Sequence, residues 1–151
     1  MKKRTKRKIY PLVNPIGHAI EGACVTDSAL LAELRRGELE AIEAMRTGAA
    51  TQEHWHQLND TASLAELMSI NGIGIEVYAA AKAAEEHLRD AVLRFRETGV
   101  MQMDAAGVLA LTDLQEYHDL QRQSIARSEY SLFIKQVIDL RTGRSPMVNV
   151  L

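Results

Sequence analysis

Residues 75–98 read IEVYAAAKAAEEHLRDAVLRFRET, and this stretch decides the fold class. Its apolar residues recur at intervals of three and four, the spacing that places side chains on one face of an α-helix. Because the first half of this face is mostly alanine, a neighbouring helix can approach it closely. Gly99 follows directly and predicts the end of the helix. The predicted inward face consists of Val77, Ala81, Ala84, Leu88, Ala91 and Phe95.

The same spacing predicts three further long helices. One begins at Thr26 or Asp27 and ends at Gly48, and another runs from Thr51 to a break at residues 71–74. From Ala105 to Arg141 no proline interrupts the chain, which predicts a single helix about 55 Å long that either bends or projects beyond the bundle at one end. The expected inward residues of the first two are Leu31, Leu34, Ile42 and Met45, then Trp55, Leu58, Ala62, Ala65 and Met68.

These elements predict an all-α fold, an up-down helical bundle of about four long helices with a long C-terminal helix. Short breaks between the first three helices favour antiparallel neighbours. We expect an extended basic arm over residues 1–13, the bundle domain over 14–143 and a C-terminal tail over 144–151. No run of eighteen apolar residues predicts a membrane span, and the single cysteine, Cys24, favours a reducing compartment. The expected location is therefore cytoplasmic.

The charges are unevenly distributed along the chain. The net charge of −2 combines a +6 arm with a −8 remainder, because six of the eighteen Lys and Arg residues fall within the first eight positions. Such a block can neutralise phosphates and attract nucleic acid in a salt-dependent way. An acidic protein surface or no partner at all is also compatible with it. The basic residues are Lys2, Lys3, Arg4, Lys6, Arg7 and Lys8.

A second unusual segment is residues 115–130, which is polar around most of the helix circumference. If Leu114 and Ile125 mark the inward seam, His118 and Gln121 lie on it too. One interpretation is a solvated face with one or two satisfied buried polar residues. The other is a recognition face for a partner, since Arg and Tyr are favoured interface anchors. That face would use Tyr117, His118, Arg122 and Arg127.

Three short patterns partly match known metal, nucleophile or phosphate-binding motifs, but each is better explained as an ordinary helix start, cysteine or turn. Glu53 and His56 have the i, i+3 spacing found in di-iron bundles, yet such sites need a second copy of the motif. Cys24 precedes a helix cap, but no motif typical of a cysteine enzyme surrounds it. The sequence NGIG at residues 71–74 lacks the remaining glycines or lysine of a phosphate-binding loop. We therefore expect no catalytic residue, no metal and no cofactor.

Several segments of the chain resemble small proteins of phages and mobile elements in Pseudomonas- and Burkholderia-like bacteria. The similar segments are residues 3–10 (KRTKRKIY), 14–16 (NPI), 19–23 (AIEGA), 71–74 (NGIG) and 117–123 (YHDLQRQ). The resemblance implies an accessory or anti-CRISPR-type context. It supplies no catalytic residue.

These observations predict a non-enzymatic interaction protein that binds a nucleic acid or nucleoprotein partner. The arm would provide electrostatic attraction and the polar face of the last helix would provide specificity. Inhibition of a host nucleic-acid-targeting complex is the setting that the resemblance implies. The alternative is a structural or assembly protein that forms a helical homo-oligomer through the apolar residues after position 132. These residues are Phe133, Ile134, Val137, Ile138 and Leu140.

Overall fold

The computed structural model describes residues 28–142, and all their regular secondary structure is α-helical. The predicted basic arm, the cap at Thr26 or Asp27, and the predicted C-terminal tail lie outside the described residues. None of the described helices is long and apolar enough to cross a membrane. The helices are α2 (Ser28–Thr47), α3 (Gln52–Ile70), α4 (Val77–Thr98), α5 (Ala105–Gln123) and α6 (Arg127–Arg141).

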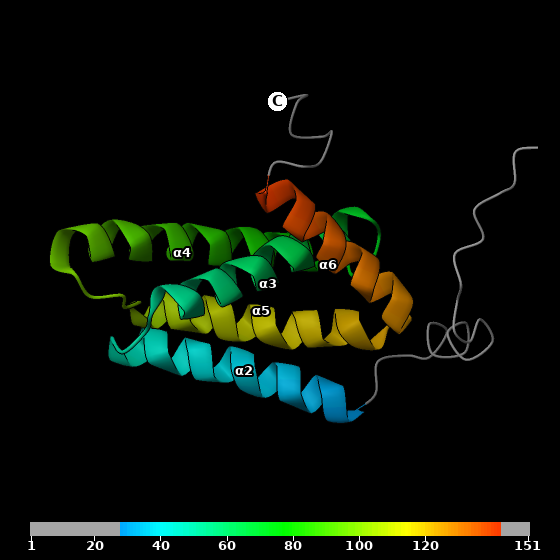
Figure 1. Cartoon of the computed structure of the whole chain (residues 1–151), viewed down its shortest axis with the longest axis horizontal. Helices are drawn as coiled ribbons and strands as arrows, with labels where there is room; N and C mark the ends of the chain where they lie inside the picture. The colour runs from blue at the N-terminus through cyan, green and yellow to red at the C-terminus, as the bar shows by residue number, and fades with distance from the viewer. Residues whose placement is uncertain (1–27, 143–151) are drawn as a thin grey trace, which may run out of the picture.

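The helices α2 to α5 form a bundle in which each helix packs against the next and α5 returns to α2 (Figure 1). The connections between them are short, so consecutive helices run in opposite directions. The last helix, α6, crosses over α3 on the outside of this bundle (Figure 1). The expected all-α helical bundle is confirmed for the described part of the chain.

The core follows the apolar spacing of the sequence. On α4, the predicted residues Val77, Ala81, Ala84, Leu88 and Ala91 are all buried. Their small side chains let α3 and α5 pack closely on either side, and the indole Nε1 of Trp55 donates to the backbone carbonyl of Leu88 at 2.8 Å. The predicted inward faces of α2 and α3 are buried or half-buried as well. Helical periodicity therefore located the core correctly.

The predicted single C-terminal helix is wrong, because the chain breaks at residues 124–126 and forms two helices. At the break, the Ser124 hydroxyl donates to the carbonyl of Gln121 at 2.7 Å and the Ser124 amide donates to it at 3.1 Å. This turn sends α6 back across α3, where Ile125, Tyr130 and Phe133 become buried. A straight helix would have carried these apolar side chains away from the bundle, so their burial favours the break.

Local signals correctly marked the turns between the earlier helices. The Thr51 side chain accepts a hydrogen bond from the His54 backbone amide, and the His54 ring accepts one from the Thr51 amide at 3.0 Å. This reciprocal capping box starts α3. The break at residues 71–74 contains Gly72 and Gly74 at φ of 86° and 66°, backbone angles that favour glycine.

Candidate functional site

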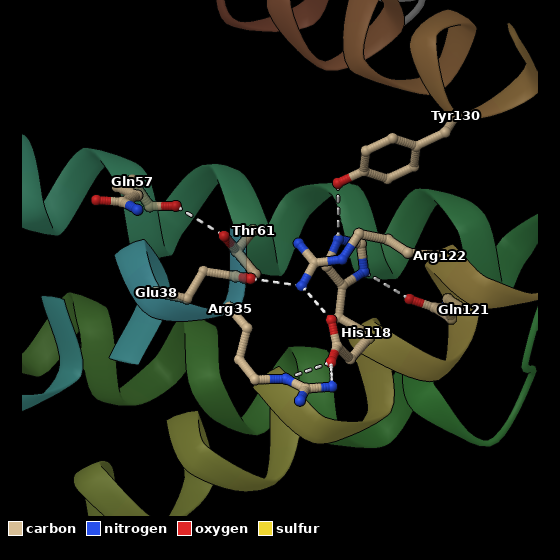
Figure 2. A network of polar contacts seen from close by, with 9 residues as sticks. Arg35, Glu38, Gln57, Thr61, His118, Gln121, Arg122 and Tyr130 are labelled. Carbon is tan, nitrogen blue, oxygen red and sulfur yellow. Dashed lines mark hydrogen bonds and ion pairs between the residues drawn. The ribbon is translucent and has the colours of Figure 1, made fainter. Parts of the chain in front are cut away.

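The polar middle of α5 lies inside the bundle and ties α5 to α2. Arg122 sits between two carboxylates: its Nη2 donates to Glu38 Oε1 and to Asp119 Oδ1, each at 2.6 Å (Figure 2). On the other side of Asp119, Arg35 Nε donates to Oδ2 at 2.6 Å, and Arg35 Nη2 contacts the same oxygen. We call these four side chains the α2–α5 charge network.

The α2–α5 charge network is electrically balanced, with two guanidinium groups and two carboxylates in alternation. Glu38, Asp119 and Arg122 are at most 3% exposed, whereas Arg35 reaches solvent. Burial raises the pKa of Glu38, although Arg122 opposes this shift. Burial by itself would lower the pKa of the Arg122 guanidinium. The nearby carboxylates of Glu38 and Asp119 outweigh this effect, so the pKa is raised. Arg122 therefore stays charged and acts as a clamp between helices.

A second group of buried polar side chains extends from α5 to α3 and α6. His118 Nδ1 lies 2.8 Å from Gln121 Oε1, and His118 Nε2 lies 3.3 Å from the Tyr130 hydroxyl (Figure 2). The amide of Gln121 donates to the backbone carbonyls of Ala65 at 3.1 Å and Ile73 at 2.8 Å. Burial lowers the pKa of His118 to about 4, so the ring is neutral at physiological pH. Because an amide oxygen only accepts, Nδ1 carries the proton and Nε2 accepts from Tyr130.

The predicted recognition face is divided between the interior and the surface. Tyr117 is 43% exposed and Arg127 is also exposed, at the start of α6. His118 and Arg122 are buried and hold helices together, so the expectation that they face a partner is corrected. The burial of His118 and Gln121 confirms the inward seam expected from Leu114 and Ile125. The six basic arm residues (Lys2, Lys3, Arg4, Lys6, Arg7 and Lys8) lie outside the described residues.

Glu38 and Asp119, the two carboxylates that neutralise Arg122, were not predicted from the sequence as site residues. Glu38 follows Leu34 by four residues and precedes Ile42 by four, which places it on the inward face of α2. A glutamate between inward-facing apolar residues indicates a buried charge, so the burial of Glu38 could have been predicted from the sequence. Nothing in the sequence assigned Glu38 to a partner, because Arg122 lies 84 positions further along the chain.

Next to the charge network, a groove of about 570 Å³ opens between α2, α3 and α6. Glu38, Arg122 and Tyr130 line its inner end. Within the described residues, Glu38 Oε2 and Arg122 Nε are buried and make no hydrogen bond. The groove also carries apolar side chains from all three helices, namely Leu34, Leu64, Ile134, Val137 and Ile138.

The outer edge of the groove is acidic. Asp60 is neutralised by Arg141, whose Nη1 donates to Asp60 Oδ2 at 2.7 Å. Glu33 and Glu53 also line the groove, and neither forms an ion pair within residues 28–142. With the inner charges balanced by the network, these two carboxylates give the groove a negative potential. The groove therefore combines apolar walls with an acidic edge.

A separate cluster of charged side chains connects α3 to α4. Lys82 Nζ lies 2.7 Å from Glu66 Oε1 and 3.2 Å from Glu85 Oε2. Burial and the nearby Glu66 raise the pKa of Glu85 to about 7. Burial also opposes ionisation of Glu66, but hydrogen bonds from Glu85 and Lys82 outweigh it and lower the pKa of Glu66. Glu85 therefore keeps its proton up to about neutral pH, while Glu66 is ionised.

The pair with the spacing of a di-iron motif lies at the surface. Glu53 and His56 are exposed near the start of α3, and the neighbouring His54 caps that helix. Residues 28–142 contain no group of three or more His, Cys, Asp or Glu side chains arranged to hold a metal ion. Cys24 lies outside the described residues.

Comparison with protein-family models, curated proteins and solved structures finds no match to this chain.

Proposed function

We propose that this chain is a non-enzymatic interaction protein of phage or mobile-element origin that binds a nucleic acid or nucleoprotein through its basic arm. The supporting observation is the separation of charge along the sequence. The first eight residues hold six basic side chains and no acidic one, whereas residues 28–142 hold eighteen acidic and eleven basic side chains. An acidic helical body repels polyanions, so attraction to phosphates must come from the arm.

The burial of His118 and Arg122 changes how the body contributes to this function. These residues stabilise the bundle, so the described helices serve as a rigid body carrying the arm. Of the four side chains expected to give specificity, Tyr117 and Arg127 remain at the surface. Inhibition of a host nucleic-acid-targeting complex, the setting implied by the resemblance, is part of the same proposal.

The test is binding of a labelled DNA duplex and a labelled RNA to the full chain at increasing salt. If all six arm cations contact phosphates of the duplex, log K should fall with log [salt] at a slope of about −5. A variant with these six residues changed to Gln should lose most of the affinity and the slope. A control changes two exposed cations of the body, Arg89→Gln and Lys135→Gln, and should keep both the affinity and the slope. Salt-independent binding, or no binding of either nucleic acid, would refute the proposal.

A second function, self-association of the bundle, is favoured by the outer surface of α6. Leu132 is 61% exposed, and Ile138 and Leu140, on opposite flanks of the helix, are 44% and 39% exposed, whereas Phe133 and Val137, which were also expected to mediate self-association, are buried against α3. If they form a homo-oligomer, Leu132→Asp should reduce the mass measured by light scattering to that of a monomer. The matched control is Leu109→Asp on α5, where the leucine is 62% exposed. A wild-type chain that is monomeric at high concentration excludes this alternative.

A further inference from the structure

We propose that the groove between α2, α3 and α6 binds the chain's own segment 6–13, KRKIYPLV, so that docking withdraws the arm from polyanions. This inference adds regulation to the proposed function, and its consequence for nucleic acid rests on that function. The docking itself does not, since it can be measured with no nucleic acid present.

The segment and the groove are chemically complementary. The segment places three cations, Lys6, Arg7 and Lys8, directly before five residues that are apolar, Ile9 to Val13. The groove offers the matching arrangement, with apolar walls from α2, α3 and α6 beside an acidic edge. Burial of apolar surface would provide affinity, and the charges would orient the segment.

Proline within the segment supports an extended peptide as the occupant. Pro11 cannot donate a backbone hydrogen bond and disfavours helix at the preceding residue, Tyr10. An extended chain can place side chains along a groove without first forming a helix. The half-buried Leu34 on α2, with Ile134 and Ile138 on α6, which are 37% and 44% exposed, provides apolar contacts for it.

The unbalanced charges are at the groove edge. Arg122 is balanced inside the α2–α5 charge network and Arg141 is paired with Asp60. Glu33 and Glu53 are left without an ion pair in the described part of the chain, and both are exposed. Two uncompensated carboxylates beside an apolar channel favour a cationic and apolar peptide over an anionic one.

The segment is also tethered close to the groove. Glu33, which lines the groove, lies only five residues after Ser28, where the described structure starts. Residues 14–27 connect the segment to that point, and fourteen residues can span up to about 46 Å. A tether of this length gives an effective concentration on the order of millimolar. Even weak docking would therefore be populated within one molecule.

The test uses the full chain with a spin label on Thr5, just outside the segment. The variant Thr5→Cys in a Cys24→Ser background carries the label, and amide signals of the chain are recorded by NMR. If the segment docks, the label should broaden amide signals of groove residues such as Gly37, Gln57 and Ile138. Signals from the exposed side of α4, such as that of Leu93, should keep their intensity.

Matched charge variants separate docking from general attraction. Glu33→Gln with Glu53→Gln should reduce the broadening at the groove by at least half. Glu86→Gln with Glu97→Gln removes the same charge from exposed sites on α4 and should leave it unchanged. Equal broadening over the whole surface, or an equal effect of both pairs of substitutions, would overturn the inference.

Two further measurements test whether the docked segment belongs to the same molecule and whether docking competes with nucleic acid. In the first, spin-labelled chain without isotope is mixed with isotope-labelled chain that carries no spin label. Broadening of groove signals in this mixture would show that the segment docks on a second copy of the chain, and it would overturn docking within one molecule. A DNA duplex should abolish the broadening in the singly labelled sample. Broadening that persists in the presence of duplex would leave the docking supported and overturn its competition with nucleic acid. Loss of nucleic-acid binding in the six-Gln arm variant is the separate test of the proposed function.

Discussion

The substitution Arg122→Ala tests whether the α2–α5 charge network holds the bundle together. Arg122 is 2% exposed and donates to two carboxylates at 2.6 Å. After its removal Asp119 keeps the contact with Arg35, but Glu38 loses its ion pair while remaining buried. The expected effect is therefore on folding rather than on binding.

The magnitude follows from the uncompensated charge. Removing one partner of a buried ion pair costs about 3–5 kcal/mol. The total free energy of unfolding of a domain is about 5–15 kcal/mol, so the loss is a large fraction of it. For a chain of this size, 1 kcal/mol lowers the melting temperature by about 2–4 °C, which gives a fall of about 6–20 °C.

The assay is thermal and urea unfolding followed by circular dichroism. Arg89→Ala, at an exposed position on α4, is the control and should change stability by no more than about 0.5 kcal/mol. Replacing both Glu38 and Arg122 with Met should be less destabilising than Arg122→Ala, because no charge is then left unpaired. An Arg122→Ala chain as stable as the control would refute the clamp and restore Arg122 as a candidate binding residue.

Three other predictions concern pH and one turn. The pKa of His118 is depressed to about 4, so the fold excludes a proton that the unfolded chain binds, and unfolding should become easier as pH falls from 6.5 to 4. In thermal melts between pH 6.5 and 4, His118→Gln should make the melting temperature depend less on pH. At pH 7 the same substitution should lower the free energy of unfolding by about 1–3 kcal/mol, because hydrogen bonds are lost. The pKa of Glu85 is raised to about 7, so its contribution to stability is present below pH 4.5 and is lost as pH rises through 7. Compared with the unsubstituted chain, Glu85→Gln should therefore gain more stability at pH 8 than at pH 5, by less than about 1 kcal/mol because the cluster is partly solvated; a variant that melts below the unsubstituted chain at pH 8 would contradict this. Gly74→Ala should cost about 1–2 kcal/mol, because φ is 66° there and the new Cβ would lie 3.2 Å from Val77 Cγ2; urea unfolding with an unchanged midpoint would disprove the strain.

Local sequence features were sufficient for the helices and most of the core. The apolar spacing of residues 75–98 located the buried face of α4, and Thr51 marked the start of α3. These features act within one or two turns of helix, so the sequence contains them completely. The same spacing placed His118 and Gln121 on the inward side of α5.

The break of the last helix depended on contacts that no local pattern contains. Residues 124–126 have neither glycine nor proline, and intrinsic propensity favours helix through them. The turn is stabilised because Tyr130 and Phe133 find apolar partners such as Leu64 and Met68 on α3. Tertiary packing outweighs helix propensity here, since propensity differences amount to a few tenths of a kcal/mol per residue.

By itself, the sequence determined the helical class, the inward faces and the separation of a basic arm from an acidic body. Only the tertiary structure decided what the polar residues of α5 do. Arg122 could be an exposed anchor or a buried clamp, and the difference lies in Glu38, which is 84 residues away in sequence and 2.6 Å away in space. A charge can be buried only where a partner neutralises it, and folding, not local pattern, brings that partner into place.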